Sequence, residues 1–143
     1  MCPRMIMSLV IMTLVVLIGG SCAARVYKVG EHEGGWSAHK DRDYYHRWTD
    51  DKNFFVGDSL IFDYDKTSFN FDDVTEVTGR LEFEYCDPTA AKAVHKTGHD
   101  VVTLTEPGIH YFINSAPGKC NAGQKLRVLV LSDPSYHASI PRP

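Results

Sequence analysis

The stretch Gly108 to Leu131, GIHYFINSAPGKCNAGQKLRVLVL, decides the fold of this chain. Residues 110–113 are aromatic and β-branched, and residues 125–131 alternate long polar with apolar side chains, which is typical of half-buried strands. The segment 115–118 between them, Ser-Ala-Pro-Gly, has the composition of a turn. A loop held between two paired strands keeps binding residues in fixed positions. We therefore expect a functional site in this loop.

Outward from this stretch, short strand patterns recur along the chain. With the two just described they make about seven strands separated by turns, which indicates an all-β sandwich. The predicted strands are residues 25–29, 59–64, 74–77, 81–85, 101–105, 110–114 and 125–131. Tyr44 and Trp48 lie at i and i+4 within residues 41–50, so one short helix is predicted there, packed over the sandwich. Residues 87–99 show no strong period and are predicted to be a connection.

The N-terminal residues Met1 to Ala24 have the pattern of a secretory signal peptide. Arg4 stands near the start, an apolar run covers residues 5–18, and small residues lead up to Ala24. A transmembrane anchor is the weaker interpretation, because the run is shorter than the roughly 20 residues that span a bilayer. We expect a signal peptide over residues 1–24, one domain over residues 25–131 and a short polar tail over residues 132–143, with no transmembrane segment in the mature chain.

The chain has four cysteines, of which Cys2 and Cys22 would leave with the signal peptide. Cys86 and Cys120 would remain in an oxidising compartment, and an even pair there predicts one disulfide. Two free thiols or a metal-binding pair are the weaker alternatives.

Charge and motifs exclude several classes of function. The formal net charge is −3, which argues against a nucleic acid as partner. The sequence has no GxGxxG, P-loop, HExxH or GxSxG motif, and no nucleophile–base pair or carboxylate pair stands out. We therefore do not expect an enzyme.

Three stretches of this chain resemble plant phytocyanins, the plastocyanin-like cupredoxins of plant cell surfaces. They are Val29-Gly30 followed by Gly35-Trp36, FFVGDSLIF at residues 54–62, and the Tyr-Phe-Ile strand end with its Pro-Gly turn, cysteine and Gly-Gln-Lys-Leu. The resemblance covers residues 25–131. It implies a cupredoxin-like Greek-key β-sandwich with one or two short helices and one disulfide. We expect Trp36 to fill part of its core, because large aromatic residues dominate core packing.

In phytocyanins a cysteine, two histidines and a weak axial methionine or glutamine bind copper. By resemblance, the matching positions here are Phe71 for the first histidine, Asn114 for the cysteine, Lys119 for the second histidine and Gln124 for the axial ligand. A blue copper centre needs two imidazoles and a thiolate. The resemblance therefore implies the early nodulin-like branch, with no metal or other cofactor and with the Phe71 ring in the space of an imidazole.

Two other metal sites are the weaker interpretations of the sequence. Asp72 and Asp73 are adjacent carboxylates, but calcium takes six or more oxygen ligands, so a solvated turn is favoured. Of the seven histidines, His95 and His99 would face together only if their connection were helical, and His110 could neighbour the site loop. Ordinary surface or packed histidines are the simpler prediction for the whole set, His32, His39, His46, His95, His99, His110 and His137.

Two functions remain. The favoured one is a non-catalytic extracellular module that binds a cell-wall glycan, a glycoprotein or a small polar ligand through Asn114, Lys119 and Gln124. The alternative is an electron-transfer protein with a non-standard copper site, for example one that uses His110. The expected location is the apoplast or cell wall, and peripheral association with the plasma membrane stays an alternative. No lipid anchor is expected, because the C-terminal tail lacks the hydrophobic end of a lipid-anchor signal.

Overall fold

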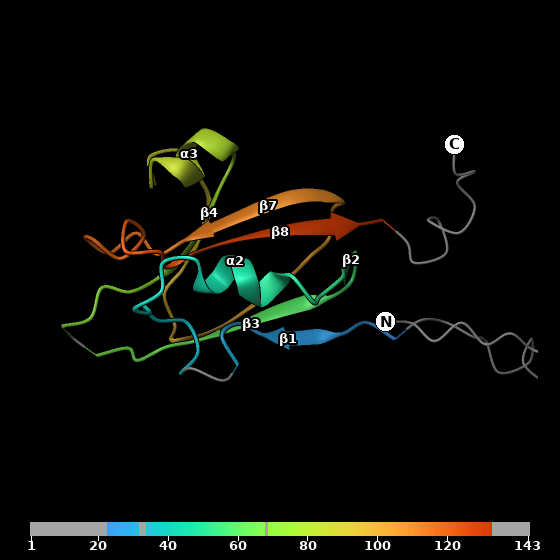
Figure 1. The fold of residues 1–143 in the computed structure, drawn as a ribbon, viewed down its shortest axis with the longest axis horizontal. Coiled ribbons are helices and arrows are strands. Elements are labelled where there is room, and N and C mark those ends of the chain that lie inside the picture. The colour runs from blue at the N-terminus through green and yellow to red at the C-terminus, as the bar shows by residue number, and fades with distance from the viewer. Residues whose placement is uncertain (1–22, 32–33, 68, 133–143) are drawn as a thin grey trace, which may run out of the picture.

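Two β-sheets form the protein in the computed structural model, which describes residues 23–31, 34–67 and 69–132 (Figure 1). The smaller sheet has the order β1-β3-β6 and the larger has the order β2-β8-β7-β4-β5. Their bounds are β1 Val26–Lys28, β2 Phe54–Phe55, β3 Ser59–Asp63, β4 Val74–Val77, β5 Ala91–His95, β6 His99–Thr103, β7 Gly108–Ile113 and β8 Lys125–Leu131. The predicted all-β sandwich is confirmed, with eight strands in place of about seven.

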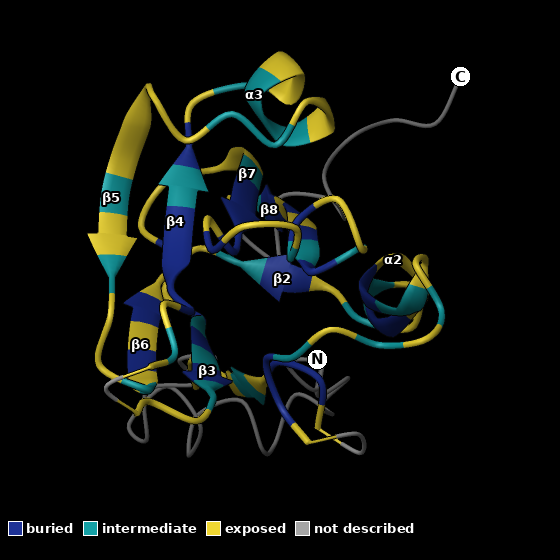
Figure 2. Cartoon of the chain, turned by 90° about the vertical axis from the view of Figure 1, so that its left-hand side faces the viewer, coloured by how far each residue is buried: buried dark blue, intermediate teal, exposed yellow. Residues whose placement is uncertain are grey.

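The core lies between the inner faces of the two sheets, and alternation along the strands fills it (Figure 2). In β8, Leu126, Val128 and Val130 are buried while Arg127 and Leu129 are exposed, as expected of a strand with one wet face. Trp36 is 1% exposed, and its Nε1 donates a hydrogen bond to the carbonyl oxygen of Asp73 at 2.8 Å. The prediction that Trp36 fills the core is confirmed.

Helix α2, Tyr44–Thr49, confirms the helix predicted within residues 41–50. Its buried residues are Tyr45 and Trp48, which join the core, whereas Tyr44 is half-buried. The buried face is therefore an i, i+3 pair and not the expected i, i+4 pair. Burial raises the pKa of Tyr45, and its hydroxyl donates to the carbonyl oxygen of Ser37 at 2.7 Å.

The predicted strand over residues 81–85 is wrong, because this segment forms helix α3, Arg80–Glu84. Apolar and polar residues that alternate over only five positions do not distinguish a strand from a helix. Here only one apolar side chain of the segment packs against the rest of the protein. Leu81 is 63% exposed, and only Phe83 packs on the sheet, with its ring centroid 5.2 Å from that of Tyr111. Arg80 Nε donates to Glu84 Oε1 at 2.7 Å, an i, i+4 pair that favours helix.

The predicted connection over residues 87–99 contains an unpredicted strand, β5. It pairs antiparallel with β4, with Val74 opposite His95, and stands at the edge of the larger sheet. Its residues are mostly exposed, so the sequence has no clear alternation to reveal it. Strand β6 then begins at His99, two residues earlier than expected, so His95 and His99 belong to strands of different sheets and not to one helix.

None of the helices in the described part of the chain is long and apolar enough to cross a membrane. The proposed signal peptide lies almost wholly outside the described residues, as do His32, His137 and residues 133–143 of the proposed tail. Those interpretations stay predictions.

The disulfide between Cys86 and Cys120 is confirmed, with 5.8 Å between the Cα atoms. It links the loop after β7 to the turn that follows α3, and not to the end of a strand as the sequence suggested. Cys120 is 4% exposed and packs with Val77, Tyr111 and Ile113 in a second apolar cluster. The bridge therefore fixes both α3 and the loop to the outer side of the larger sheet.

Removing the bridge should destabilise the fold. The half-cystines are separated by 34 positions, for which the loop-entropy relation gives roughly 3 to 4 kcal/mol. We expect the double variant Cys86→Ser, Cys120→Ser to lose about this much free energy of unfolding in a urea titration, and the double change avoids an odd reactive thiol. Two alkylatable thiols at these positions in the native protein would contradict the assignment.

Candidate functional site

The loop between β7 and β8, which runs from Asn114 to Gln124, is held rigidly at its base. The N–H of Asn114 donates to the carbonyl oxygen of Gln124 at 3.1 Å, and the N–H of Gln124 donates to that of Lys119 at 3.1 Å. Gly123 has a φ of +106°, and a Cβ there would lie 2.5 Å from the carbonyl oxygen of Arg42. This turn therefore needs glycine, and the loop has little freedom to rearrange.

Asn114 is fully buried and its side chain is an acceptor for two backbone groups. Its Oδ1 accepts the N–H of Asp73 at 3.3 Å and the N–H of Ala116 at 3.0 Å, while its Nδ2 has no partner among the described residues. Two N–H groups that converge on one atom suit an electron-rich acceptor. The neutral amide oxygen satisfies both donors here.

Asp73 joins this loop to the segment before β4. Its Oδ1 accepts the N–H of Ser115 at 2.8 Å, and the hydroxyl of Ser115 donates to its other oxygen. Since Asp73 is only 3% exposed, its carboxylate is a buried bridge. The interpretation of Asp72 and Asp73 as a solvated turn is therefore wrong, because both side chains point inward to partners that the sequence did not reveal.

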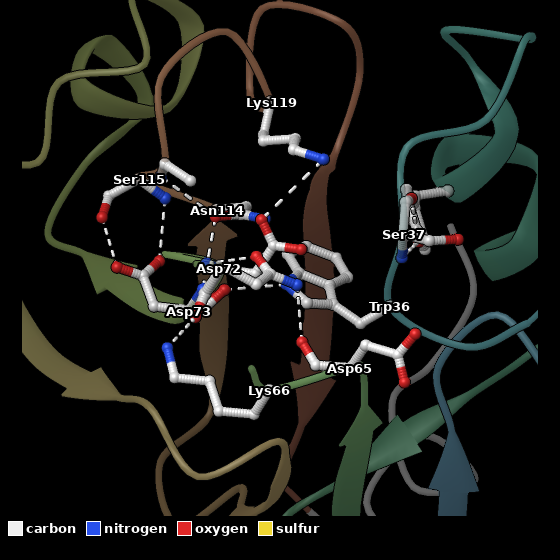
Figure 3. Close-up of polar contacts among 12 residues, drawn as sticks. Trp36, Ser37, Asp65, Lys66, Asp72, Asp73, Asn114, Ser115 and Lys119 are labelled. Atoms are coloured by element: carbon white, nitrogen blue, oxygen red, sulfur yellow. Dashed lines mark hydrogen bonds and ion pairs between the residues drawn. The ribbon is translucent and has the colours of Figure 1, made fainter. Parts of the chain in front are cut away.

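Asp72 faces Lys119 across the end of the sandwich (Figure 3). Asp72 is 6% exposed, and its Oδ1 lies 3.9 Å from Nζ of Lys119, whose side chain is 42% exposed. That distance is too long for a hydrogen bond, so the contact is an ion pair and leaves Oδ1 without a hydrogen-bond donor. The backbone carbonyl of Asp72 accepts Nζ of Lys66 at 2.9 Å.

Phe71 does not occupy this site. It is 74% exposed, so the expectation that its ring fills the space of an imidazole is wrong. Neighbouring side chains of an extended segment point to opposite sides, and the Asp72 N–H is held by Oδ1 of Asn70 at 2.9 Å. The structure thus brings Asp72 to the loop. The residue at the loop is one position later than Phe71, the residue that the resemblance implied.

Of the three predicted ligand-binding residues, only Lys119 reaches solvent. Asn114 and Gln124 are both 0% exposed, so a ligand on the surface would contact Lys119 and not these amides. Neither amide atom of the Gln124 side chain has a partner among the described residues. The loop therefore encloses more polar atoms than the surrounding protein groups satisfy.

The residues at this end do not fit type 1 copper. Such a site needs two imidazoles and a thiolate, and the groups here are the carboxylate of Asp72, the amides of Asn114 and Gln124 and the ammonium of Lys119, which has no lone pair. No group of three or more histidine, cysteine, aspartate or glutamate side chains in the described ranges could hold a metal ion. His110 is engaged elsewhere, with Nδ1 3.1 Å from Glu76 Oε1 and Nε2 2.8 Å from the Glu106 carbonyl oxygen.

A polar hollow of about 420 Å³ lies beside Asp72. Burial raises the pKa of Tyr64, whose hydroxyl donates to Asp100 at 2.5 Å, so the Tyr64 hydroxyl stays protonated. Sequence reasoning missed the hollow because its residues come from separate segments and share no motif. They are Gly34, Trp36, Ser37, Asp63, Tyr64, Asp65, Asn70, Asp72 and Gly98.

Comparison with known proteins agrees with this geometry. Residues 36–124 match the plastocyanin-like domain. The chain is 35% identical over 107 residues to stellacyanin of Toxicodendron vernicifluum, an alignment that covers 73% of this chain and 95% of that protein. It is 34% identical over 125 residues to early nodulin-like protein 10 of Arabidopsis thaliana, covering 87% of this chain and 66% of that protein.

Solved structures give the same family. Cucumber stellacyanin with Cu²⁺ superposes with a TM-score of 0.69 at 31% identity, covering 77% of this chain and 97% of that one. Cucumber basic protein, a blue copper protein, gives 0.61 at 34% identity, covering 74% and 99%. The chain spans nearly all of stellacyanin but about two thirds of the early nodulin-like protein. On its sequence match, its two-sheet fold and its Cys86–Cys120 disulfide, this chain belongs to the phytocyanin family of plastocyanin-like proteins.

Proposed function

We propose that this protein is a secreted, non-catalytic phytocyanin-like module of the early nodulin-like type, which does not bind type 1 copper and binds an extracellular polar ligand, a cell-wall glycan or glycoprotein. One observation carries the first part of the proposal. Asp72 forms an ion pair with Lys119 of the loop in which, by the resemblance, Asn114 takes the position of the copper cysteine, and this charged pair supports a site without copper.

Electrostatics favours this pair over a copper ion. The ammonium of Lys119 would repel Cu²⁺ at close range, and the repulsion is strongest where water is partly excluded. The carboxylate beside it, that of Asp72, already forms an ion pair with that ammonium. The Asn114 oxygen is occupied by two N–H donors, so it has little remaining capacity for a metal bond.

The alternative is copper-based electron transfer through a non-standard site, which the family makes plausible. It would need a set of soft or imidazole ligands. His99 contacts Asp63 and His110 contacts Glu76. The two histidines lie on different sheets. These positions support the first function over the second.

Copper loading provides the first test. The unmodified protein is expected to show no intense visible absorption after incubation with Cu²⁺, because it lacks the thiolate that gives charge transfer. The triple variant Asp72→His, Asn114→Cys, Lys119→His should turn blue, since the two N–H groups that serve the Asn114 oxygen would then serve a thiolate. Absorption and electron paramagnetic resonance spectra measure both outcomes.

A matched triple variant tests the assignment of the first ligand position. Phe71→His with Asn114→Cys and Lys119→His places its imidazole at a position that is 74% exposed, so this variant should stay colourless. A blue Phe71 variant beside a folded but colourless Asp72 variant would show that Asp72 is not the position of the metal ligand. Stoichiometric type 1 copper in the unmodified protein would refute the proposed function.

The ion pair itself can be measured by a double-mutant cycle. Asp72→Asn, Lys119→Met and the double variant should give a coupling free energy of roughly 0.5 to 1 kcal/mol in urea unfolding. The value is small because Lys119 is half-exposed and water screens the pair. The coupling should shrink in high salt. If the losses of stability in the two single variants simply add up in the double variant, Asp72 and Lys119 do not form an ion pair in solution.

The proposed polar ligand fits the hollow beside Asp72. Asp65 is exposed, with a carboxylate that has no protein partner among the contacts of the described residues, and Ser37 and Asn70 line the same hollow. Carboxylates accept hydrogen bonds from hydroxyl groups, and amides both accept and donate them. A sugar presents many such hydroxyl groups. Lys119 lies on the far side of Asp72 and can contact a ligand that extends past the hollow.

A glycan array with the unmodified protein should identify bound oligosaccharides. Asp65→Ala and Lys119→Ala are expected to weaken the selected interaction by about tenfold each, the size of one lost hydrogen bond to a charged group, as measured by calorimetry. Both side chains are at least partly exposed, so the variants should keep the fold. Unchanged affinity in both variants would place the glycan elsewhere on the protein.

A further inference from the structure

The outer face of the larger sheet has a second site, away from the site loop. Strands β7 and β8 turn Ile109, Tyr111, Arg127 and Leu129 outward, since the intervening positions fill the core. Helix α3 packs against β7 and α2 packs against β8, so the two helices border this face (Figure 2). Ile109 is 41% exposed and Leu129 is 56% exposed.

A cavity of about 390 Å³ lies between α3 and this face. Its apolar wall is made by Phe83, Ile109 and Tyr111, and its charged wall by Arg80, Glu84 and Arg127. Small-molecule sites typically have this size and this composition, mostly apolar with a few convergent polar groups. The rings of Phe83 and Tyr111 lie 5.2 Å apart with 43° between their planes, which leaves a tilted aromatic wall.

The charges in the cavity are not balanced. Arg80 and Glu84 neutralise each other through their 2.7 Å contact. Arg127 is exposed, and its guanidinium forms none of the side-chain hydrogen bonds, ion pairs or ring contacts found among the described residues. Lys125 Nζ lies 4.7 Å from the Phe83 ring centroid and donates to the Phe83 carbonyl oxygen at 3.1 Å, so it adds positive charge on the same side. One guanidinium therefore faces the cavity with its donors unused.

We propose that this cavity binds a small organic carboxylate with an apolar, aromatic body. The planar guanidinium of Arg127 matches a carboxylate through two parallel N–H···O bonds, and the body of the ligand packs on Phe83, Tyr111 and Ile109, where ring contacts add to the burial of apolar area. A peptide added as a further strand does not fit, because that mode uses a free sheet edge, whereas this cavity lies over the faces of β7 and β8 and under α3.

This site goes beyond the proposed function and does not depend on it. The cavity lies on the outer face of the sheet, whereas Asp72, Asn114 and Lys119 lie at the end of the sandwich. Copper loss and glycan binding can each fail without effect on it. Lys119→Ala is therefore a matched control for a variant of Arg127, since both changes remove one partly exposed positive charge.

The test is a titration of the full mature protein with 3-phenylpropanoate, followed by ¹H–¹⁵N chemical shifts. The expected result is saturable shifts at Phe83, Ile109 and Tyr111, with affinity at least about tenfold weaker for Arg127→Gln and for the uncharged 3-phenylpropanamide. Lys119→Ala should bind as the unmodified protein does. Arg127 is exposed, so the glutamine variant should fold, which circular dichroism checks.

Several results would overturn the proposal. They are no saturable shift, equal affinity for the carboxylate and its amide, and shifts confined to the smaller cavity of about 220 Å³ on the other side of Arg127, where Lys52, Asn53 and Phe54 lie. Equal weakening by Lys119→Ala and Arg127→Gln would also overturn it, because it would indicate general attraction of an anion to a positive surface.

Discussion

The antiparallel pairing of β7 with β8 is the constraint on which the rest of the structure depends. Its register runs from Gly108 opposite Val130 to Ile113 opposite Lys125, and it decides which side chains face the core. A slip of one residue would turn Phe112 and Leu126 outward. The same register closes the loop with the Asn114–Gln124 backbone contact. Both the end of the sandwich and its outer face are therefore set by one pair of strands.

At the end of the sandwich the fold keeps a buried polar interior without the ligand set of a copper site. Asp73 and the N–H groups that meet Asn114 connect the loop to the segment before β4, so the enclosure is retained. Unsatisfied buried polar atoms cost about 1–3 kcal/mol each, and Asn114 and Gln124 both carry such atoms. These unpaired atoms therefore contribute little to the stability of the fold.

The disulfide and α3 shape the other side of the sheet. Because Cys86 joins Cys120, α3 is held beside β7, and Phe83 covers part of Tyr111. The helix is too short to cover the whole face, so Ile109 and Arg127 stay accessible. An apolar wall next to an unpaired guanidinium follows from this incomplete cover, and it places a second recognition surface on the same sheet.

The sequence by itself determined the sandwich class, the Cys86–Cys120 bridge, the short helix before β2 and the position of the site loop, because each depends on local periodicity, turn residues or cysteine count. It could not separate helix from strand over residues 80–84, or reveal β5, since both segments bury few side chains and so lack a clear pattern. Only the tertiary structure placed Asp72 at the site in place of Phe71, buried Asn114 and Gln124, and brought Phe83 to Arg127. These contacts join residues far apart in the chain, and packing across the two sheets, which no local pattern records, decides them.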